Sequence, residues 1–566
     1  MAALRGVFSE GYHKADFRAD LLAGAVVGIV ALPLSMALAI ATGVAPQHGL
    51  FTAVVAGGII ALLGGSRFQV SGPTAAFVVV LVPIVTQFGL GGLMLASAMA
   101  GVILVTMAVA RLGRLLQFIP HPVTTGFTAG IAIVIATLQL KDFLGLSINE
   151  MPDHFVDRAL AIFSALPSVQ PVEVVIGALT LSTLLLWPRL TRSVPAPLVA
   201  LTLGALVAYA LGHILSDADI ATIGTRFSYT VDGVVHAGIP QGPPMFMLPW
   251  NAPGADGQPI GFSWDLIRSL APSASAIAML GAIESLLSAV VADSVTGHRH
   301  DPDVELFAQG IGNIVVPFFG GFAATGAIAR TATNIRSGAR SPIAAIIHAA
   351  FVLAAMLLLA PLLAYLPMAS LAALLLLVAW NMSEVRHVLH AVRVSPRSDV
   401  FVLLTCIVLT VVFDMVVAVV AGVLLAALLF MRRMAEVSNV RLTSDAHQKL
   451  AGLPPGVLHY AIGGPLFFGA AQKAMSALDS IGNDVWAVVI DLTDVPAMDA
   501  TGLVNLESAL ARLRHGHRHV VIAGVQPQPR SLLSRAHIGA AGDSVTICDT
   551  LADAVANIRN RFQQRA

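Results

Sequence analysis

The stretch that decides the fold runs from Arg67 to Val85 and reads RFQVSGPTAAFVVVLVPIV. Its apolar part is too short to cross a bilayer, because a straight helical span needs about 20 residues. The preceding tetrapeptide, Ser71–Thr74, consists of residue types that cap, break or restart helices. Non-helical backbone at membrane depth is tolerated only where protein buries it or where it lines a watery cavity. The stretch therefore predicts a helix that begins inside the membrane, with Ser71 as its N-cap and Pro73 in its first turn.

The composition of the whole chain is that of a polytopic membrane protein. Of its 566 residues, 57% are hydrophobic and 11% are charged, whereas an ordinary soluble domain has about a quarter charged residues. Lys plus Arg and Asp plus Glu both number 32, so no basic surface for nucleic acid is expected. Cys406 and Cys548 lie far apart and imply no disulfide framework. The first 20 residues lack the apolar core of a signal peptide, so the first apolar segment is expected to direct insertion.

Apolar runs along the chain predict about fourteen membrane segments. Two of them are short and begin at Gly72 and near Thr325. A polar insert at 213–264 separates seven segments from seven and marks the midpoint of a duplication, with repeats at about 21–212 and 265–433. Basic residues flank the first segment and follow the last, at Arg432 and Arg433. The positive-inside rule then places both termini in the cytoplasm.

The second short segment is the counterpart of the first. It lies in FFGGFAATGAIARTATNIRSG, 318–338, where Gly320, Gly321 and Gly326 permit a broken entry and a short helix begins at Ala327. Interrupted segments at matching places in two halves of a chain indicate a transporter's binding site, with two half-helix N-termini facing one anion. Arg330, one turn into the second helix, adds a full positive charge. The alternative is structural, since Gly and Pro are common in membrane helices and neighbouring helices can satisfy the freed backbone.

Glu284 is the most telling charged residue of the membrane segments. In APSASAIAMLGAIESLLSAVVADSVTGH, thirteen apolar or small residues precede it and eight follow it before Asp293. A charged side chain at this depth costs several kcal/mol unless it is paired or protonated. Glu284 is therefore expected to face the same cavity and to carry a proton. The alternative is a structural carboxylate that is hydrogen-bonded to a neighbouring helix.

After Arg433 the pattern changes to short β-like runs that alternate with amphipathic helical ones. This alternation predicts a small α/β domain with helices packed on a sheet. The expected organisation is a cytoplasmic N-terminal segment at 1–20, a transmembrane transport domain at 21–433 and a cytoplasmic α/β domain at 438–566.

The ordered motifs resemble the SulP family of anion transporters. They are ALPLSMALAIATGVAPQHGLFTAVVAG, QVSGPTAAF, GAIESLL, ELFAQGIGNIVVPFFGG and ATGAIARTATNIRSGA, followed by a region that resembles the STAS domain. The resemblance implies fourteen segments in two inverted repeats of seven, arranged as core and gate domains, and a homodimer. It also implies an anion held between the third and tenth helices. The motifs place it near Ser71, Gly72, Thr74 and Ala75 on one side and Gly326, Ala327, Ile328 and Arg330 on the other.

Two departures from the family pattern bear on function. Sodium-driven bicarbonate members have Asp where this chain has Glu284 and Thr where it has Ile328. These changes weaken the expectation of a sodium site and favour proton coupling. In the STAS-like region, VPAMDATGLVNL resembles a loop that is phosphorylated at a Ser after the Asp, but Ala500 stands there, with Thr501 one position further on.

The resulting functional prediction is a bacterial inner-membrane carrier that imports C4-dicarboxylates such as succinate, fumarate and aspartate together with protons. Within the family, the details look most like bacterial members with these substrates. The alternative is an inorganic-anion carrier for sulfate, bicarbonate or chloride, because a site built from backbone identifies charge better than shape. A rival from another class is a membrane-tethered scaffold whose STAS domain binds a partner protein. No metal, cofactor or enzymatic activity is expected, since no metal motif, nucleophile elbow or phosphate loop appears.

Overall fold

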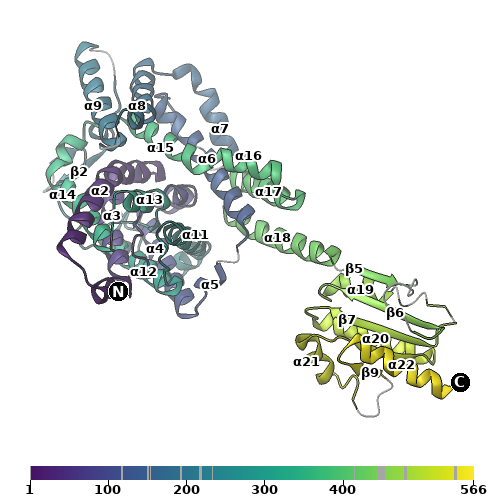
Figure 1. Ribbon diagram of the computed structural model, residues 1–566. Helices are drawn as coiled ribbons and strands as arrows, with labels where there is room; N and C mark the ends of the chain where they lie inside the picture. The colour runs from purple at the N-terminus through teal and green to yellow at the C-terminus, as the bar shows by residue number, and fades with distance from the viewer. Residues whose placement is uncertain are drawn as a thin grey trace. The chain divides into compact units, whose positions relative to one another are not determined.

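The computed structural model describes residues 2–116, 119–148, 152, 155–191, 194–215, 219–231, 234–413, 415–437, 439–443, 453–476, 478, 481–482, 484–540 and 545–565. The chain divides into two compact units, Met1–Val423 and Leu424–Ala566. Figure 1 shows that the first unit is helical and that the second combines helices with a sheet.

The helices of the first unit, in chain order, are α1 Ala2–Glu10, α2 Lys14–Thr42, α3 Pro46–Leu63, α4 Ala75–Val109, α5 Gly113–Leu116, α6 His121–Phe143, α7 Phe155–Ser164, α8 Pro171–Leu190, α9 Ala196–Ile214, α10 Ile223–Arg226, α11 Trp264–Thr296, α12 Pro302–Val315, α13 Ile328–Arg336, α14 Ile343–Leu363, α15 Met368–Ser383, α16 Val385–Val394 and α17 Arg397–Val412. Helix α18, Met415–Val437, runs across the unit boundary. Short strands β1 Ser71–Gly72 and β4 Thr325–Gly326 precede α4 and α13, and the polar insert contains the hairpin of β2 Ser228–Val231 and β3 Val234–Ala237.

The described helices match the predicted membrane segments. Ten helical segments are long and apolar enough to cross a membrane, and one of them, Met368–Val394, comprises both α15 and α16. One of these, α4, bends sharply at Gly89, where φ is 69° and ψ is −167°, and so forms two segments. A Cβ atom at Gly89 would lie 2.3 Å from the backbone of Gly254, so the bend requires glycine. The extra segment of α4 and the shorter helices α12, α13 and α17 complete the fourteen that the sequence predicts.

The membrane helices pack in two groups. Helices α2, α3, α4, α11, α12, α13 and α14 pack mainly on one another, and α6, α8, α9, α15 and α17 form a second set of neighbours. This division corresponds to the core and gate domains that the resemblance implies. The two short strands, each followed by a helix, lie in the first group.

The second unit is an α/β domain, as predicted. Its sheet has the order β5-β6-β7-β8-β9, with β5 antiparallel to β6 and the other pairs parallel. The strands are β5 Asn439–Thr443, β6 Val457–Gly463, β7 Ala487–Asp494, β8 His519–Ala523 and β9 Val545–Cys548, and the helices are α19 Phe468–Ser476, α20 Ala500–His515, α21 Pro527–Arg535 and α22 Leu551–Arg565. Buried residues of the strands alternate between two apolar clusters, one on each face of the sheet. The sequence reasoning missed β5, although its sequence NVRLT alternates polar and apolar residues as a half-buried strand does.

Candidate anion-binding site

The two broken segments meet inside the first unit, which confirms that they are a pair. Strand β1 pairs antiparallel with β4, with Ser71 opposite Gly326 and Gly72 opposite Thr325. Helix α4 then begins at Ala75 and α13 at Ile328. Neither helix receives a side-chain cap from its N-cap residue. The first-turn N–H groups of both helices therefore lie next to the β1–β4 pair and receive no hydrogen bond from an N-cap side chain.

The helix start in the first segment differs from the prediction. Ser71 is not an N-cap: it lies in β1, and its hydroxyl accepts a hydrogen bond of 3.0 Å from Nε2 of Gln309. The N-cap position belongs to Thr74. Pairing with β4 holds Ser71 and Gly72 extended, so the helix begins later than the capping residues alone suggest.

A cavity of about 320 Å³ adjoins the two helix starts. It is lined by six of the predicted residues: Thr74, Ala75, Glu284, Ala327, Ile328 and Arg330. The other three, Ser71, Gly72 and Gly326, do not line it and instead form the paired strands. Apolar side chains that the sequence reasoning did not identify complete the wall, among them Leu34, Leu38, Phe127, Leu287, Val378 and Met382. Leu34, Leu38 and Leu287 belong to the motifs quoted above, but nothing in the sequence marks any of the six as part of a cavity wall.

Arg330 supplies a positive charge with free hydrogen-bond donors. Its side chain is buried, and Nη2 donates to the carbonyl oxygen of Pro73. Nε and Nη1 have no hydrogen-bond partner in the described protein. Buried polar groups are nearly always satisfied, so two orphan donors beside a cavity call for an explanation. An anion in the cavity would provide one, because a guanidinium binds oxyanions through paired N–H groups.

Glu284 and Thr74 connect α11 to the start of α4. Oγ1 of Thr74 donates a hydrogen bond of 2.8 Å to Oε2 of Glu284, and both residues line the cavity. Among the described residues, no ion pair within 4.0 Å joins Glu284 to Arg330. The cavity wall thus holds a carboxylate and a guanidinium that are not directly paired.

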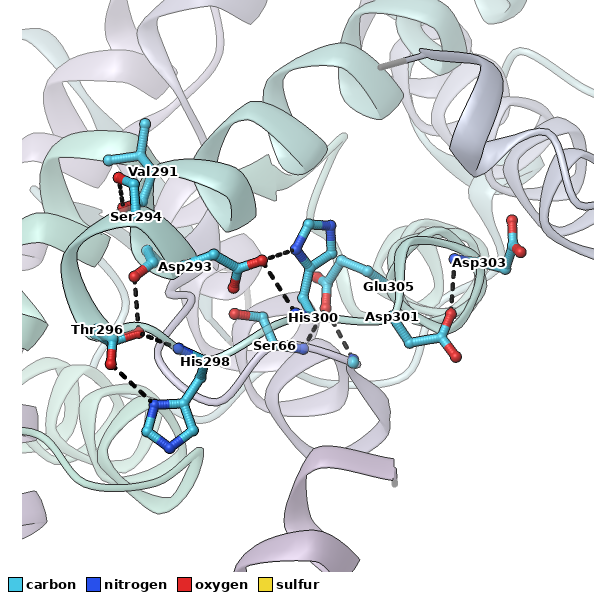
Figure 2. A network of polar contacts seen from close by, with 12 residues as sticks. Ser66, Val291, Asp293, Ser294, Thr296, His298, His300, Asp301, Asp303 and Glu305 are labelled. Atoms are coloured by element: carbon cyan, nitrogen blue, oxygen red, sulfur yellow. Dashed lines mark hydrogen bonds and ion pairs between the residues drawn. The ribbon is translucent and has the colours of Figure 1, made fainter.

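Glu305 on α12 anchors the chain that leads into β1. Its Oε2 accepts hydrogen bonds from the backbone of Gly65 at 2.9 Å and Ser66 at 3.1 Å. Its Oε1 accepts from Nε2 of Gln69 at 2.9 Å and of Gln309 at 3.1 Å. Figure 2 shows this carboxylate next to the turn between α11 and α12. The sequence reasoning missed this role, although a lone carboxylate in the apolar run ELFAQGIGN was an available signal.

The same network reaches the helices that carry the site. Gln69 Nε2 also donates to Oγ of Ser285 at 3.0 Å, next to Glu284 in the chain. In Figure 2, Asp293 accepts from His300 across the α11–α12 turn, with Nδ1 of His300 and Oδ2 of Asp293 2.7 Å apart. A buried network whose members are hydrogen-bonded rigidifies its surroundings. These contacts hold α11, α12 and β1 as one unit behind the cavity.

Gly72 gives a first test of this geometry. A Cβ atom there would lie 2.6 Å from Nη1 of Arg330, and φ is +157°. We expect Gly72→Ala to displace the guanidinium and to lower the apparent anion affinity by about tenfold or more, as overpacking of this kind costs about 1–3 kcal/mol. Gly58→Ala is the matched control, because its Cβ would meet only Ala349 Cβ at 3.8 Å. Equal affinities in purified Gly72→Ala and Gly58→Ala proteins would contradict the arrangement.

Comparisons with known proteins identify the family. Residues 17–406 match the model of the sulfate permease family and residues 451–554 that of the STAS domain. The chain is 39% identical to the candidate sulfate transporter YvdB of Bacillus subtilis, over 93% of this chain and 95% of YvdB. It is 30% identical to the bicarbonate transporter BicA of Picosynechococcus, over 92% and 91%.

A solved structure shows the same fold. Murine Slc26a9, an anion transporter in an inward-facing state, superposes with a TM-score of 0.84 over 99% of this chain and 94% of its own. The sequence identity is only 17%, so this likeness concerns the fold alone. The fold class predicted from the sequence, a polytopic helical transporter with a C-terminal STAS domain, is confirmed. The chain therefore belongs to the sulfate permease family of membrane anion transporters and carries a C-terminal STAS domain.

Proposed function

We propose that this protein transports a small inorganic oxyanion, sulfate or bicarbonate, together with protons across a bacterial plasma membrane. The observation that carries the proposal is the cavity in which the orphan donors of Arg330 lie with Glu284 and the starts of α4 and α13. The relatives described above are named for sulfate and bicarbonate. They favour the alternative of an inorganic-anion carrier over the C4-dicarboxylate carrier that the sequence analysis predicts.

The charges in the cavity suggest how anion and proton travel together. Arg330 and the two helix N-termini offset the charge of a bound anion. An ionised Glu284 in the same cavity would repel that anion, because the low dielectric of the site strengthens Coulomb interactions. A proton on Glu284 removes the repulsion. Proton and anion then stabilise each other's binding, which is the condition for symport.

The position of the cavity is suited to alternating access. Thr74, Glu284 and Arg330 come from the first group of helices, and Phe127 and Val378 come from α6 and α15 of the second. A movement of one group relative to the other would therefore open and close the wall around a site carried by the first group. The cavity also reaches Arg336 and Glu384, at the ends of α13 and α15.

The deciding experiment is uptake of labelled sulfate and bicarbonate into proteoliposomes, with and without an inward proton gradient and with succinate as a competitor. Gradient-stimulated uptake of either inorganic anion that succinate does not inhibit would support the proposal. Uptake of succinate that sulfate and bicarbonate do not inhibit would overturn the choice of substrate but would not argue against the proposed site. No uptake of any of these anions would favour the regulatory scaffold. Light scattering of the purified protein tests the predicted homodimer.

A dicarboxylate remains the second candidate because one observation favours it. Arg336, which the sequence reasoning did not assign, lines the cavity together with Arg330 of the same helix. Two guanidinium groups on one wall suit a substrate with two separated carboxylates better than a single oxyanion. We expect Arg336→Gln to weaken succinate competition severalfold and to leave sulfate affinity unchanged. An equal effect on both anions would remove Arg336 as a determinant of specificity.

A further inference from the structure

Helix α16, Val385–Val394, has a sequence that the transport mechanism does not use. It reads VRHVLHAVRV. Val385, Val388, Leu389 and Val392 recur at the spacing of one helical face, and Arg386, His390 and Arg393 gather on the adjoining side of the helix. A short helix with one apolar and one basic face is the type that lies in a membrane interface.

The apolar face of α16 is only partly covered by the rest of the described protein. The helix contains no buried residue. Val385 is 36% exposed, Leu389 49% and Val392 40%. By hydropathy alone, Met368–Val394 would be one membrane span of 27 residues. The backbone of Glu384 is left-handed, with φ and ψ of 42° and 41°, so α15 ends at Ser383 and α16 starts as a separate helix.

The neighbouring helices indicate what covers this face. Helix α15 forms the N-terminal part of the candidate span Met368–Val394, and α17, Arg397–Val412, is the next apolar helix of the chain. The short link between two spans lies at a membrane surface, where an apolar stripe enters the acyl boundary and basic side chains reach the headgroups. Arg386 and Arg393 are two turns apart on one side of the helix and are exposed. Neither belongs to an ion pair in the described part of the chain.

We propose that α16 lies in the headgroup layer of the leaflet beside the cavity mouth and binds anionic phospholipids through Arg386 and Arg393. Guanidinium groups match phosphate geometry, and each basic residue near an anionic surface contributes about fivefold in membrane affinity. Glu384, whose strained backbone joins α15 to α16, lines the anion cavity together with Asn381 and Met382. The lipid contact therefore holds the residues at the mouth of the cavity and links lipid charge to transport.

The position of the helix is tested by spin labels on the full-length protein in liposomes. The background is Cys548→Ser, since Cys406 is fully buried. Labels go on Leu389→Cys and His390→Cys, on the two faces of α16, and on Val504→Cys of α20 as an aqueous reference. We expect the Leu389 label to be reached by oxygen but not by an aqueous nickel chelate, and the His390 label to be reached by the chelate. This readout does not depend on the transported anion.

Two results would overturn the proposed position. A Leu389 label that the chelate reaches as readily as the Val504 label would place the face in water. A Leu389 label shielded from both oxygen and chelate would show that protein, such as a second copy of the chain, covers it.

The lipid preference is tested with phosphatidylcholine vesicles with and without phosphatidylglycerol. Phosphatidylglycerol should bury the Leu389 label more deeply and speed uptake of whichever anion the competition assay identifies. Arg386→Gln with Arg393→Gln should lose both effects, whereas the charge-matched control Arg535→Gln with Arg561→Gln should keep them. An unchanged response in the α16 variant would exclude binding of anionic lipid by these arginines. A changed label depth with an unchanged uptake response would overturn the link to the cavity mouth.

Discussion

Replacing Glu284 with glutamine is expected to abolish the stimulation of uptake by an inward proton gradient while anion binding and exchange persist. Glutamine has nearly the shape of a protonated glutamate, and its carbonyl oxygen can still accept the hydrogen bond that Thr74 donates at 2.8 Å. The variant therefore gives the cavity the charge that it has when Glu284 is protonated. The anion no longer needs a proton to bind, so binding loses its dependence on pH and uptake loses its coupling. Counterflow and gradient-driven uptake in the same proteoliposomes measure the two properties separately.

A matched control comes from a second buried carboxylate of the same unit. Glu173 on α8 is 1% exposed and accepts a hydrogen bond of 2.7 Å from the backbone of Ala221, but it does not line the cavity. Glu173→Gln should retain the gradient response. If Glu284→Gln also retains it, Glu284 is a structural carboxylate, which is the alternative that the sequence leaves open, and the proton must bind elsewhere.

The sequence predicts the pairing of the two broken segments because the signal is local. Gly and Pro interrupt each apolar run at matching places, and physical chemistry forbids such breaks in contact with lipid. The start of the first helix was predicted wrongly because it depends on a partner that is remote in the chain. Ser71 pairs with Gly326, and its hydroxyl bonds to Gln309, so the extended strand replaces the expected first turn.

The role of Glu305 was missed for a related reason. A sequence shows that a carboxylate lies in an apolar run, but it does not show which donors converge on it. In the structure, all four hydrogen bonds of Glu305 come from N–H groups, three of which belong to the chain leading into β1. The apolar wall of the cavity is equally non-local, since Leu34, Phe127 and Val378 lie on three different helices.

The motifs of the binding site do not decide the substrate, for a chemical reason. A site made of helix N-termini and one arginine recognises negative charge, and it places few side chains that distinguish a sulfate from a carboxylate. The shape of the cavity is set by residues such as Leu38 and Met382, which lie outside the broken segments. The whole-chain similarity to YvdB and BicA therefore adds information that the binding motifs lack.

Replacing Arg330 with alanine is expected to weaken anion binding by on the order of 10- to 100-fold, since hydrogen bonds to charged groups are worth about 1.5–3 kcal/mol. The orphan Nε and Nη1 donors are the groups that an anion would satisfy. Arg330→Lys keeps the charge but loses the planar pair of donors, so it should fall between alanine and arginine. Equilibrium binding to detergent-solubilised protein measures the loss without any proton gradient.

Arg336, six residues further along α13, separates a local role of Arg330 from a general effect of charge. Arg336 also lines the cavity, at the end of the helix, so Arg336→Ala removes the same charge from the same wall. If long-range attraction alone draws the anion in, the two alanine variants should weaken sulfate binding alike, and added salt should shrink both effects. If Arg330 binds the anion directly, Arg330→Ala should weaken sulfate binding much more than Arg336→Ala does, and the difference should persist in high salt. Equal affinities in the wild-type protein and Arg330→Ala would exclude Arg330 from the site, and its orphan donors would then need another partner.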